Sequence, residues 1–280
     1  MSADPAQVTA ARAGHAMRAC RMGKNARDAS VRDVPNTAHP NAFPAQEQYR
    51  ERSSSLPGAV VWTRETVGAT DARVLPDGSM DLLWIDGRLA VAGPDTRAYV
   101  LSVGPATRIA GIRFFPGSAP ALLGIPAHEL RDGRADLADI WAPADVRRAN
   151  DLLARAGHPA AGLEEIARWR AADAAVPDPL LHAIVSQLRA GESVSALADS
   201  LELGARRLHR LSLTAFGYGP KTLARILRMQ RALALARTGT AFAEVAARTG
   251  YADQPHLSRE IRALTGLSLT GVTRARPAQP

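Results

Sequence analysis

The sequence predicts an α+β protein: a small antiparallel β-domain with helices, followed by an all-α domain of two helix-turn-helix units joined by a linker helix. Three observations carry this prediction. Strand-like runs separated by turn residues lie between Tyr49 and Phe115, helical periodicity dominates from Asp178 onward, and one helix-turn-helix plan occurs twice in that helical part. With 280 residues, the chain is long enough for two domains and a sizeable core.

Composition divides the chain into four expected parts. Residues 1–45 are rich in Ala, Arg, Asn and Asp and lack apolar periodicity, which predicts a disordered leader. Residues 46–142 form the β-rich part, which we expect to be regulatory or sensory. Residues 143–177 are Ala-rich and predict a helical connector, and residues 178–280 form the helix-turn-helix domain.

Turn chemistry organises the β-rich part. Asp86-Gly87 is a strong hairpin signal between two apolar runs. The expected strands are Val60–Thr63, Met80–Ile85, Arg88–Ala92, Tyr99–Val103 and Ile109–Phe115. We expect the aromatic residues here to fill the core of the β-domain, with a ligand pocket as the alternative; they are Trp62, Trp84, Phe114 and Phe115.

The connector predicts two helices, Pro143–Ala156 and Gly162–Ala172. The sequence Pro177-Asp178-Pro179 then marks a boundary. Asp178 can cap the next helix, and Pro179 can open it without losing a hydrogen bond. The helix-turn-helix domain therefore begins at a recognisable capping signal.

The first helix-turn-helix unit follows this boundary. Ser193 caps a short helix, and the helix expected over 205–213 follows a turn that ends at Gly204. A long helix over about 221–236 then leads to the second unit. The unit is expected to present Arg206, Arg207, His209 and Arg210 away from or beside its apolar stripe.

The second unit contains the most informative stretch, which extends from Thr249 to Arg262. Gly250 can end the helix expected over Phe242–Arg248, because glycine adopts positive φ at little cost. Asp253 is a good N-cap, and Pro255 falls in the first turn. The expected apolar stripe is Leu257, Ile261 and Leu264; the side chains off that stripe are Gln254, His256, Arg259 and Arg262. Such a helix suits the major groove of DNA.

The net charge of +8 is unevenly distributed. Residues 178–280 hold 14 Lys or Arg and 7 Asp or Glu, a net charge of +7, whereas residues 46–177 have a net charge of −2. A basic excess in one domain indicates a polyanionic partner. The alternative is a solvated, Arg-rich surface.

Other classes of function have little support. Cys20 is the single cysteine, so neither an intramolecular disulfide nor a cysteine-rich zinc site can form. The seven His lack metal-ligand spacing, no glycine loop suits a phosphate, and no catalytic constellation stands out, so we expect neither enzyme activity nor a metal or cofactor. The absence of a secretory segment and of a bilayer-spanning run predicts a cytoplasmic protein without membrane contact.

The helical part resembles the AraC/XylS family of transcription regulators. In the second unit the matching positions are Phe242, Val245, Ala246, Gly250, Tyr251, Leu257, Arg259, Ile261 and Gly266. In the first unit and the linker they are Leu197, Ala198, Leu208, Arg210, Gly217, Pro220, Arg228 and Ala232. Three positions depart: Gly204 and Pro255 replace small polar residues, and Leu269 replaces a proline.

A second resemblance covers about Tyr49 to Ile140. The runs Arg73–Trp84 and Gly111–Gly117 look like a domain of unknown function that precedes the DNA-binding part of some AraC-type regulators. This resemblance implies a sensory or regulatory role and names no ligand.

Together the resemblances imply a sequence-specific regulator that binds promoter DNA, with RNA polymerase as a partner and a possible small-molecule effector. We expect an activator, with repression as the alternative. The positions that match base-contacting residues are Arg206, His209, Arg210, Gln254, His256 and Arg259. We expect phosphate or solvent contact at Arg207, Lys221, Arg225 and Arg262. The alternatives are a non-specific architectural DNA-binding protein and an enzyme domain fused to a DNA reader.

Overall fold

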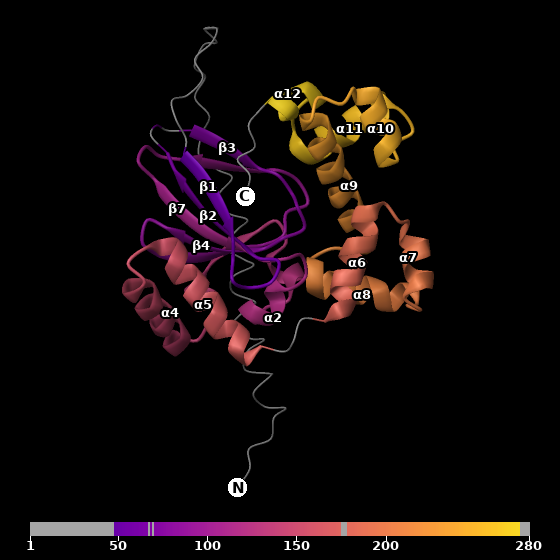
Figure 1. Cartoon of the computed structure of the whole chain (residues 1–280). Helices are drawn as coiled ribbons and strands as arrows, with labels where there is room; N and C mark the ends of the chain where they lie inside the picture. The colour runs from indigo at the N-terminus through magenta and orange to yellow at the C-terminus, as the bar shows by residue number, and fades with distance from the viewer. Residues whose placement is uncertain (1–47, 67, 69, 175–177, 275–280) are drawn as a thin grey trace, which may run out of the picture.

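The computed structural model describes residues 48–66, 68, 70–174 and 178–274. The predicted leader and Pro177 of the expected boundary lie outside the described residues. Within them, a β-domain with helices on one face is joined to a group of helices at its side (Figure 1). The predicted α+β class is confirmed.

The β-domain contains two antiparallel sheets. The larger sheet has the strand order β1-β2-β7-β4-β5-β8, and β3 pairs with β6 in a two-stranded sheet. The strands are β1 (Gln48–Ser53), β2 (Val60–Glu65), β3 (Thr70–Val74), β4 (Asp81–Ile85), β5 (Arg88–Ala92), β6 (Tyr99–Val103), β7 (Arg108–Arg113) and β8 (Arg134–Asp136). The strands β1, β3 and β8 were not predicted, because their polar sequences lack an apolar alternation and only pairing with a neighbour makes them strands.

The predicted hairpin is confirmed. Ile85 pairs with Arg88 across the turn, and both central residues have positive φ, 44° at Asp86 and 96° at Gly87. This conformation matches the twist of the two strands, which explains why the dipeptide predicts the turn well.

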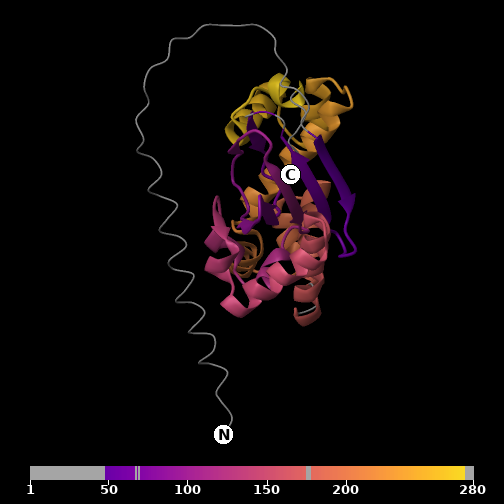
Figure 2. The ribbon, with the colours of Figure 1, turned by 90° about the vertical axis from the view of Figure 1, so that its left-hand side faces the viewer.

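One face of the larger sheet packs against helices. Buried Val61, Leu82 and Ile112 contribute to a core that also includes Leu163 and Ile166 of α5. The helices and turns around this core are α2 (Ala119–Leu123), η1 (Ala127–Leu130), α3 (Leu137–Ile140), α4 (Pro143–Arg155) and α5 (Pro159–Asp173). Figures 1 and 2 show α4 and α5 as a layer against the strands.

Helix α5 begins earlier than the sequence predicts. The Nδ1 atom of His158 accepts a hydrogen bond from the Ala160 backbone N–H at 3.3 Å, and Pro159 occupies the first turn. Glu164 in this helix is buried and accepts hydrogen bonds from Arg52 Nη2 at 2.6 Å and from the Ser55 backbone N–H at 2.7 Å. These bonds hold the pKa of Glu164 down at about 2 and fasten the end of β1 to the helical layer.

The helical part follows the predicted plan. Its helices are α6 (Pro179–Ala190), α7 (Val194–Ser200), α8 (Ala205–Phe216), α9 (Pro220–Arg237), α10 (Phe242–Thr249), α11 (Gln254–Thr265) and α12 (Leu269–Arg274). Asp178 Oδ1 accepts from the Leu180 backbone N–H at 2.9 Å, and Ser193 Oγ accepts from Ala196 at 3.1 Å. Both predicted N-caps are therefore confirmed.

Helix α9 belongs to both units. Leu223, Ile226 and Leu227, in its first half, lie in the hydrophobic cluster of α6, α7 and α8. Met229 and Leu233, in its second half, lie in the cluster of α10, α11 and α12. Its 18 residues span about 27 Å at 1.5 Å per residue, so one straight element sets the separation of the two units.

The β-domain contacts both units. The Phe115 ring, which we expected in the β-core, instead stacks on His182 of α6, with ring centroids 4.1 Å apart. Leu75 is buried in the cluster of the second unit, and the Ala98 backbone N–H donates to the Leu264 carbonyl at 2.7 Å. The β-domain therefore helps to hold the two units in their relative positions.

Candidate nucleic-acid interface

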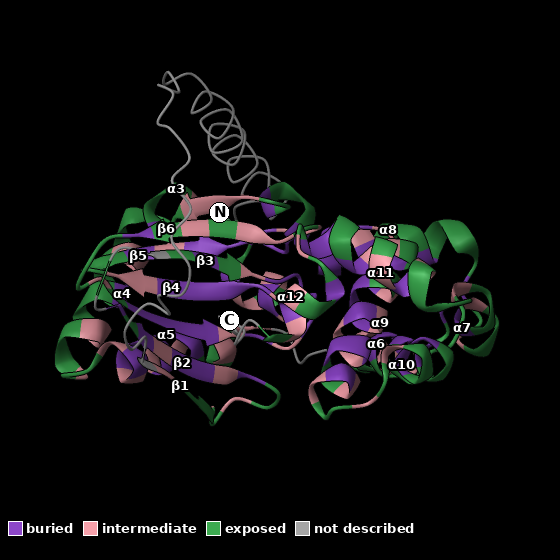
Figure 3. Ribbon diagram, turned by 90° about the horizontal axis from the view of Figure 1, so that it is seen from above, coloured by how far each residue is buried: buried purple, intermediate pink, exposed green. Residues whose placement is uncertain are grey.

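The second helix of each helix-turn-helix unit is the candidate reading helix: α8 in the first unit and α11 in the second. Helix α8 packs with the first half of α9, and α11 packs mainly with its second half (Figure 1). Viewed from above, both lie on the same side of α9 (Figure 3). This arrangement suits two contacts with one face of a duplex.

Helix α8 has a buried back and a basic front. Leu208, Ser212 and Phe216 are buried and recur at helical spacing. The sequence-predicted residues of this helix are all exposed: Arg206, Arg207, His209 and Arg210. The structure therefore brings these four side chains together on the outer surface of one helix.

Helix α11 begins as the sequence predicts. Asp253 Oδ1 accepts a hydrogen bond from the His256 backbone N–H at 2.6 Å, and Pro255 lies in the first turn. Leu257 and Ile261 are fully buried. Because the cap and this apolar stripe fix the start and the rotation of the helix, they decide which side chains face outward.

The outward face of α11 is polar. Gln254, Arg259 and Arg262 are exposed, whereas His256 is half-buried. The His256 ring meets the Tyr251 ring edge-on at 5.3 Å, and its Nδ1 atom accepts from the Ala252 backbone N–H at 3.4 Å. His256 thus supports the turn, which leaves its other ring nitrogen, Nε2, as the atom with which it would contact a base.

An acid whose side chain is only 9% exposed joins α11 to α9 as a clamp, and sequence reasoning missed it. Glu260 accepts hydrogen bonds from Arg228 Nη2 at 2.7 Å, Tyr251 Oη at 3.1 Å and Arg225 Nε at 3.2 Å. The Arg228 guanidinium also lies over the Tyr251 ring, 4.3 Å from its centroid. Burial alone would raise the pKa of Glu260, but the hydrogen bonds and charges of the arginines outweigh it and lower the pKa.

One of the predicted phosphate contacts already takes part in these bonds to Glu260, whereas the other three do not. Arg225 is half-exposed and holds Glu260, while Arg207, Lys221 and Arg262 are exposed. A signal for the clamp was present: Glu260 is the single acid of α11, and arginines occur three residues apart in α9. Only the fold shows that these two faces meet.

Both reading helices rest on the β-domain at their carboxyl ends. The C-cap of α8, Gly217, lies against Pro94 and the Ala127 carbonyl. A Cβ at Gly266, the C-cap of α11, would lie 3.2 Å from Nη1 of Arg73. The amino-terminal halves, which carry the predicted base contacts, are left exposed.

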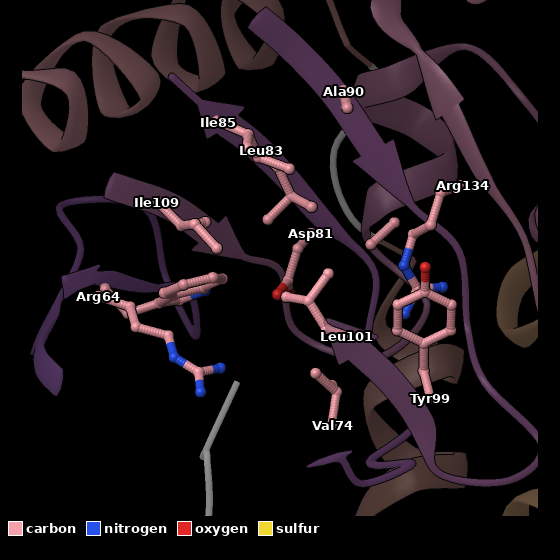
Figure 4. Close-up of a pocket in the computed structure, with 12 residues that line it drawn as sticks. Arg64, Val74, Asp81, Leu83, Ile85, Ala90, Tyr99, Leu101, Ile109 and Arg134 are labelled. Carbon is pink, nitrogen blue, oxygen red and sulfur yellow. The ribbon is translucent and has the colours of Figure 1, made fainter. Parts of the chain in front are cut away.

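A separate cavity of about 200 Å³ lies in the β-domain, between the larger sheet and the β3–β6 pair. Its lining is mostly aliphatic and aromatic, and Figure 4 places the Asp81 carboxylate among Leu83, Leu101 and Ile109. Burial raises the pKa of Asp81 to about 6, although the nearby Arg113 guanidinium opposes the shift. The aromatic core predicted for this domain therefore contains an opening beside Trp62.

In the part of the chain that the structure describes, no group of His, Cys, Asp or Glu is arranged to hold a metal ion. No helix among the same residues is both long and apolar enough to cross a bilayer.

Two family models match the chain. A helix-turn-helix domain matches residues 197–275, and a domain of unknown function, DUF6597, matches residues 59–136. No curated protein matches the chain.

The similar solved structures include ToxT from Vibrio cholerae, which shares 10% identity, covers 79% of this chain and 96% of its own, and has a TM-score of 0.43. The unsaturated fatty acid-bound ToxT from strain SCE256 shares 10% identity, covers 78% and 95%, and has a TM-score of 0.42. A probable AraC family transcriptional regulator from Rhodopseudomonas palustris CGA009 shares 21% identity, covers 37% and 100%, and has a TM-score of 0.31. At these values no residue role transfers to this chain.

The matched helix-turn-helix model is of the AraC type, and its span includes both reading helices and α9. The chain therefore carries an AraC-type helix-turn-helix domain behind a DUF6597 domain, which makes it a DNA-binding transcription regulator.

Proposed function

We propose that the chain reads a specific, asymmetric DNA sequence with both helix-turn-helix units of one molecule. The observation that carries this proposal is the exposure of polar, hydrogen-bonding side chains on α8 and α11 while the apolar stripe of each helix is buried. Arginine can hold guanine, and glutamine adenine, through paired hydrogen bonds in the major groove.

The spacing of the helices supports simultaneous contact. Successive major grooves on one face of B-DNA are about 34 Å apart. Helix α9 spans about 27 Å; α8 packs with its first half and α11 mainly with its second half, on one side of it. One molecule can therefore reach two adjacent grooves without the two-fold symmetry of a dimer.

The residue roles come from the family resemblance, and the exposure of most of these side chains supports them. Arg206, His209 and Arg210 of α8 read bases in the first groove. In the second groove Gln254, His256 and Arg259 of α11 do so. The remaining cations contact phosphates; they are Arg207, Lys221, Arg225 and Arg262, of which Arg225 also has to keep Glu260 in place.

The regulatory part of the proposal concerns the β-domain. Its contacts with both units and its cavity support a sensory role, in which a small molecule changes the affinity of the helical part for promoter DNA. On this proposal RNA polymerase is the partner at the promoter, and the protein acts there as an activator.

The test is a selection with the full-length protein from duplexes that contain a randomised segment of about 30 base pairs, three turns of B-DNA. We expect enrichment of a two-part motif whose halves are about one helical turn apart, and an affinity for the enriched duplex at least about 1000-fold above that for its shuffled sequence. Equal affinity for both duplexes across a salt series would identify a non-specific architectural protein instead.

A further inference from the structure

We propose that the cavity of the β-domain binds an uncharged, mostly apolar molecule that carries one hydroxyl group and is about the size of a substituted benzene ring. Occupation of the cavity changes DNA affinity through the segment between β5 and β6. The second statement rests on the proposed DNA-reading function; the first does not.

Charges around the cavity cancel one another. Arg134 forms two hydrogen bonds with Asp95, at 2.7 and 3.0 Å. Arg113 lies 3.4 Å from an oxygen of Asp77 and 3.4 Å from an oxygen of Asp81. Arg64 also lines the cavity, and it too has an interaction partner. An ionised ligand would lose its hydration on entering the cavity, and no unpaired opposite charge there would offset that free-energy cost. The site therefore favours a neutral molecule.

The walls and the volume fix the approximate size of the ligand. Apart from the charged residues and Tyr99, the lining is apolar: Trp62, Val74, Leu83, Ile85, Leu101 and Ile109, with Ala90 and Ala92. An apolar cavity of about 150 Å³ in another protein admits benzene. A cavity of about 200 Å³ therefore has room for one ring with a short substituent.

Two buried polar groups select a hydroxyl. Asp81 is only 7% exposed and Trp62 only 8% exposed, and both line the cavity. The indole Nε1 atom of Trp62 makes no hydrogen bond of ordinary geometry among the described residues, but it lies near enough to the Asp81 carboxylate to lower the pKa of that acid slightly. Asp81 keeps acceptor capacity beyond its contact with Arg113, because an ionised carboxylate offers about four lone-pair sites. A hydroxyl can donate to Asp81 and accept from Trp62 at once, whereas a hydrocarbon does neither.

The cavity wall continues directly to both reading helices. Ala92 and Tyr99 line the cavity and flank the β5–β6 segment, Gly93–Ala98. Within this segment Pro94 lies against the C-cap of α8, and the Ala98 backbone N–H donates to Leu264 of α11 at 2.7 Å. A ligand that moves the cavity wall therefore also moves the Gly93–Ala98 segment, which contacts both α8 and α11. This movement alters the spacing of the two helices.

The binding test compares three matched probes with the full-length protein by calorimetry and thermal shift: benzyl alcohol, toluene and benzoate. We expect benzyl alcohol to bind about tenfold more tightly than toluene, the effect of roughly one hydrogen bond, and benzoate to bind more weakly than either. Tighter binding of benzoate, or no binding of any probe, would overturn the ligand class.

Substitutions in the cavity test whether the probes bind there. Asp81→Leu should remove the preference for benzyl alcohol over toluene, a ratio that can be measured even if the variant is less stable. Leu101→Trp should fill the cavity and abolish binding of both. Asp151→Asn, an exposed carboxylate on α4, is the control and should change neither. An unchanged preference in Asp81→Leu would contradict the assignment of the hydrogen bond.

The coupling test measures affinity for the selected duplex with and without saturating benzyl alcohol. We expect a change of about fivefold or more in the wild-type protein and none in Leu101→Trp. An unchanged affinity would refute the coupling while leaving the DNA-reading function intact. Failure to select any duplex would instead refute the proposed function, and benzyl alcohol binding would still be measurable.

Discussion

The two reading helices both have a buried apolar stripe and a polar front, but different contacts fix their positions. Helix α8 begins at Gly204 without a side-chain cap, and the guanidinium groups of Arg206 and Arg210 form no ion pair within the described residues. Helix α11 begins at a capping Asp253 and is clamped to α9 through Glu260. The first helix depends on apolar packing, whereas the second also depends on a partly buried polar network.

This difference shows how a basic helix can be oriented without losing its polar front. An apolar stripe fixes the rotation of a helix, but it allows small slides along the stripe. Directional hydrogen bonds to a buried carboxylate restrict such slides. We therefore expect α11 to be the more precisely placed helix and the more sensitive to single polar substitutions.

The largest effect should follow from Glu260→Gln. The change removes the charge that three donors share, and we expect a loss of about 2–3 kcal/mol of stability, below the range for fully buried pairs because Arg225 and Arg228 are partly exposed. Thermal unfolding and hydrogen exchange in α11 measure it.

The matched control is Glu244→Gln, which breaks an exposed pair with Arg248 and should cost less than about 0.5 kcal/mol. Equal effects of the two substitutions would show that the clamp adds nothing to the fold.

Acid should loosen the same clamp. The pKa of Glu260 is lowered in the folded protein, so its contribution to stability is present above the ordinary carboxylate pKa and is lost as the pH falls through the folded value. Hydrogen exchange between pH 6 and pH 3 should show α11 opening more readily as the pH falls, with a smaller change in α8. The Glu260→Gln variant should lose this difference between the helices.

Arg259→Ala and Arg262→Ala separate the reading of bases from the binding of phosphates. The first should weaken the selected duplex by roughly tenfold and the shuffled duplex little, because it removes a base contact. The second should weaken both duplexes alike and reduce the salt slope by about 1. Affinities measured across a salt series decide the matter, and identical behaviour of the two variants would refute these roles.

Loss of the cap should have a moderate effect. Asp253→Ala removes the acceptor for the His256 backbone N–H and should cost about 1 kcal/mol of stability. Thermal unfolding measures the loss, with the exposed Asp199→Ala as control, expected to change stability by less than about 0.5 kcal/mol. A larger effect in the control would argue against capping as the cause.

The smallest effect should come from giving α8 the cap that it lacks. Gly204 has φ −60° and ψ 144°, and a Cβ there would meet nothing within 4 Å. Gly204→Ser should therefore stabilise the protein by a few tenths of a kcal/mol. Denaturant unfolding can resolve this gain if m is unchanged, and a loss of stability would mean that the turn before α8 needs glycine.

Much of the helical part was predictable because its signals are local. A cap such as Asp253 and a stripe such as Leu257, Ile261 and Leu264 lie within one helix, so their spacing identifies them. The same reasoning predicted the hairpin at Asp86 and Gly87. It failed for the polar edge strand β1, which is a strand because it pairs with β2. It also misplaced Phe115, because nothing in its own segment reveals that His182 faces it.

The sequence by itself determined the capped starts of the helices in the helical part, the hairpin turn and the polar fronts of the two reading helices, because capping, periodicity and turn preference act over a few residues. The tertiary structure alone decided that Glu260 meets Arg225 and Arg228, that charges balance around Asp81, and that one short segment contacts both helices. These features depend on residues that are far apart in the chain, and their energies arise only when folding brings the charges together and removes them from water.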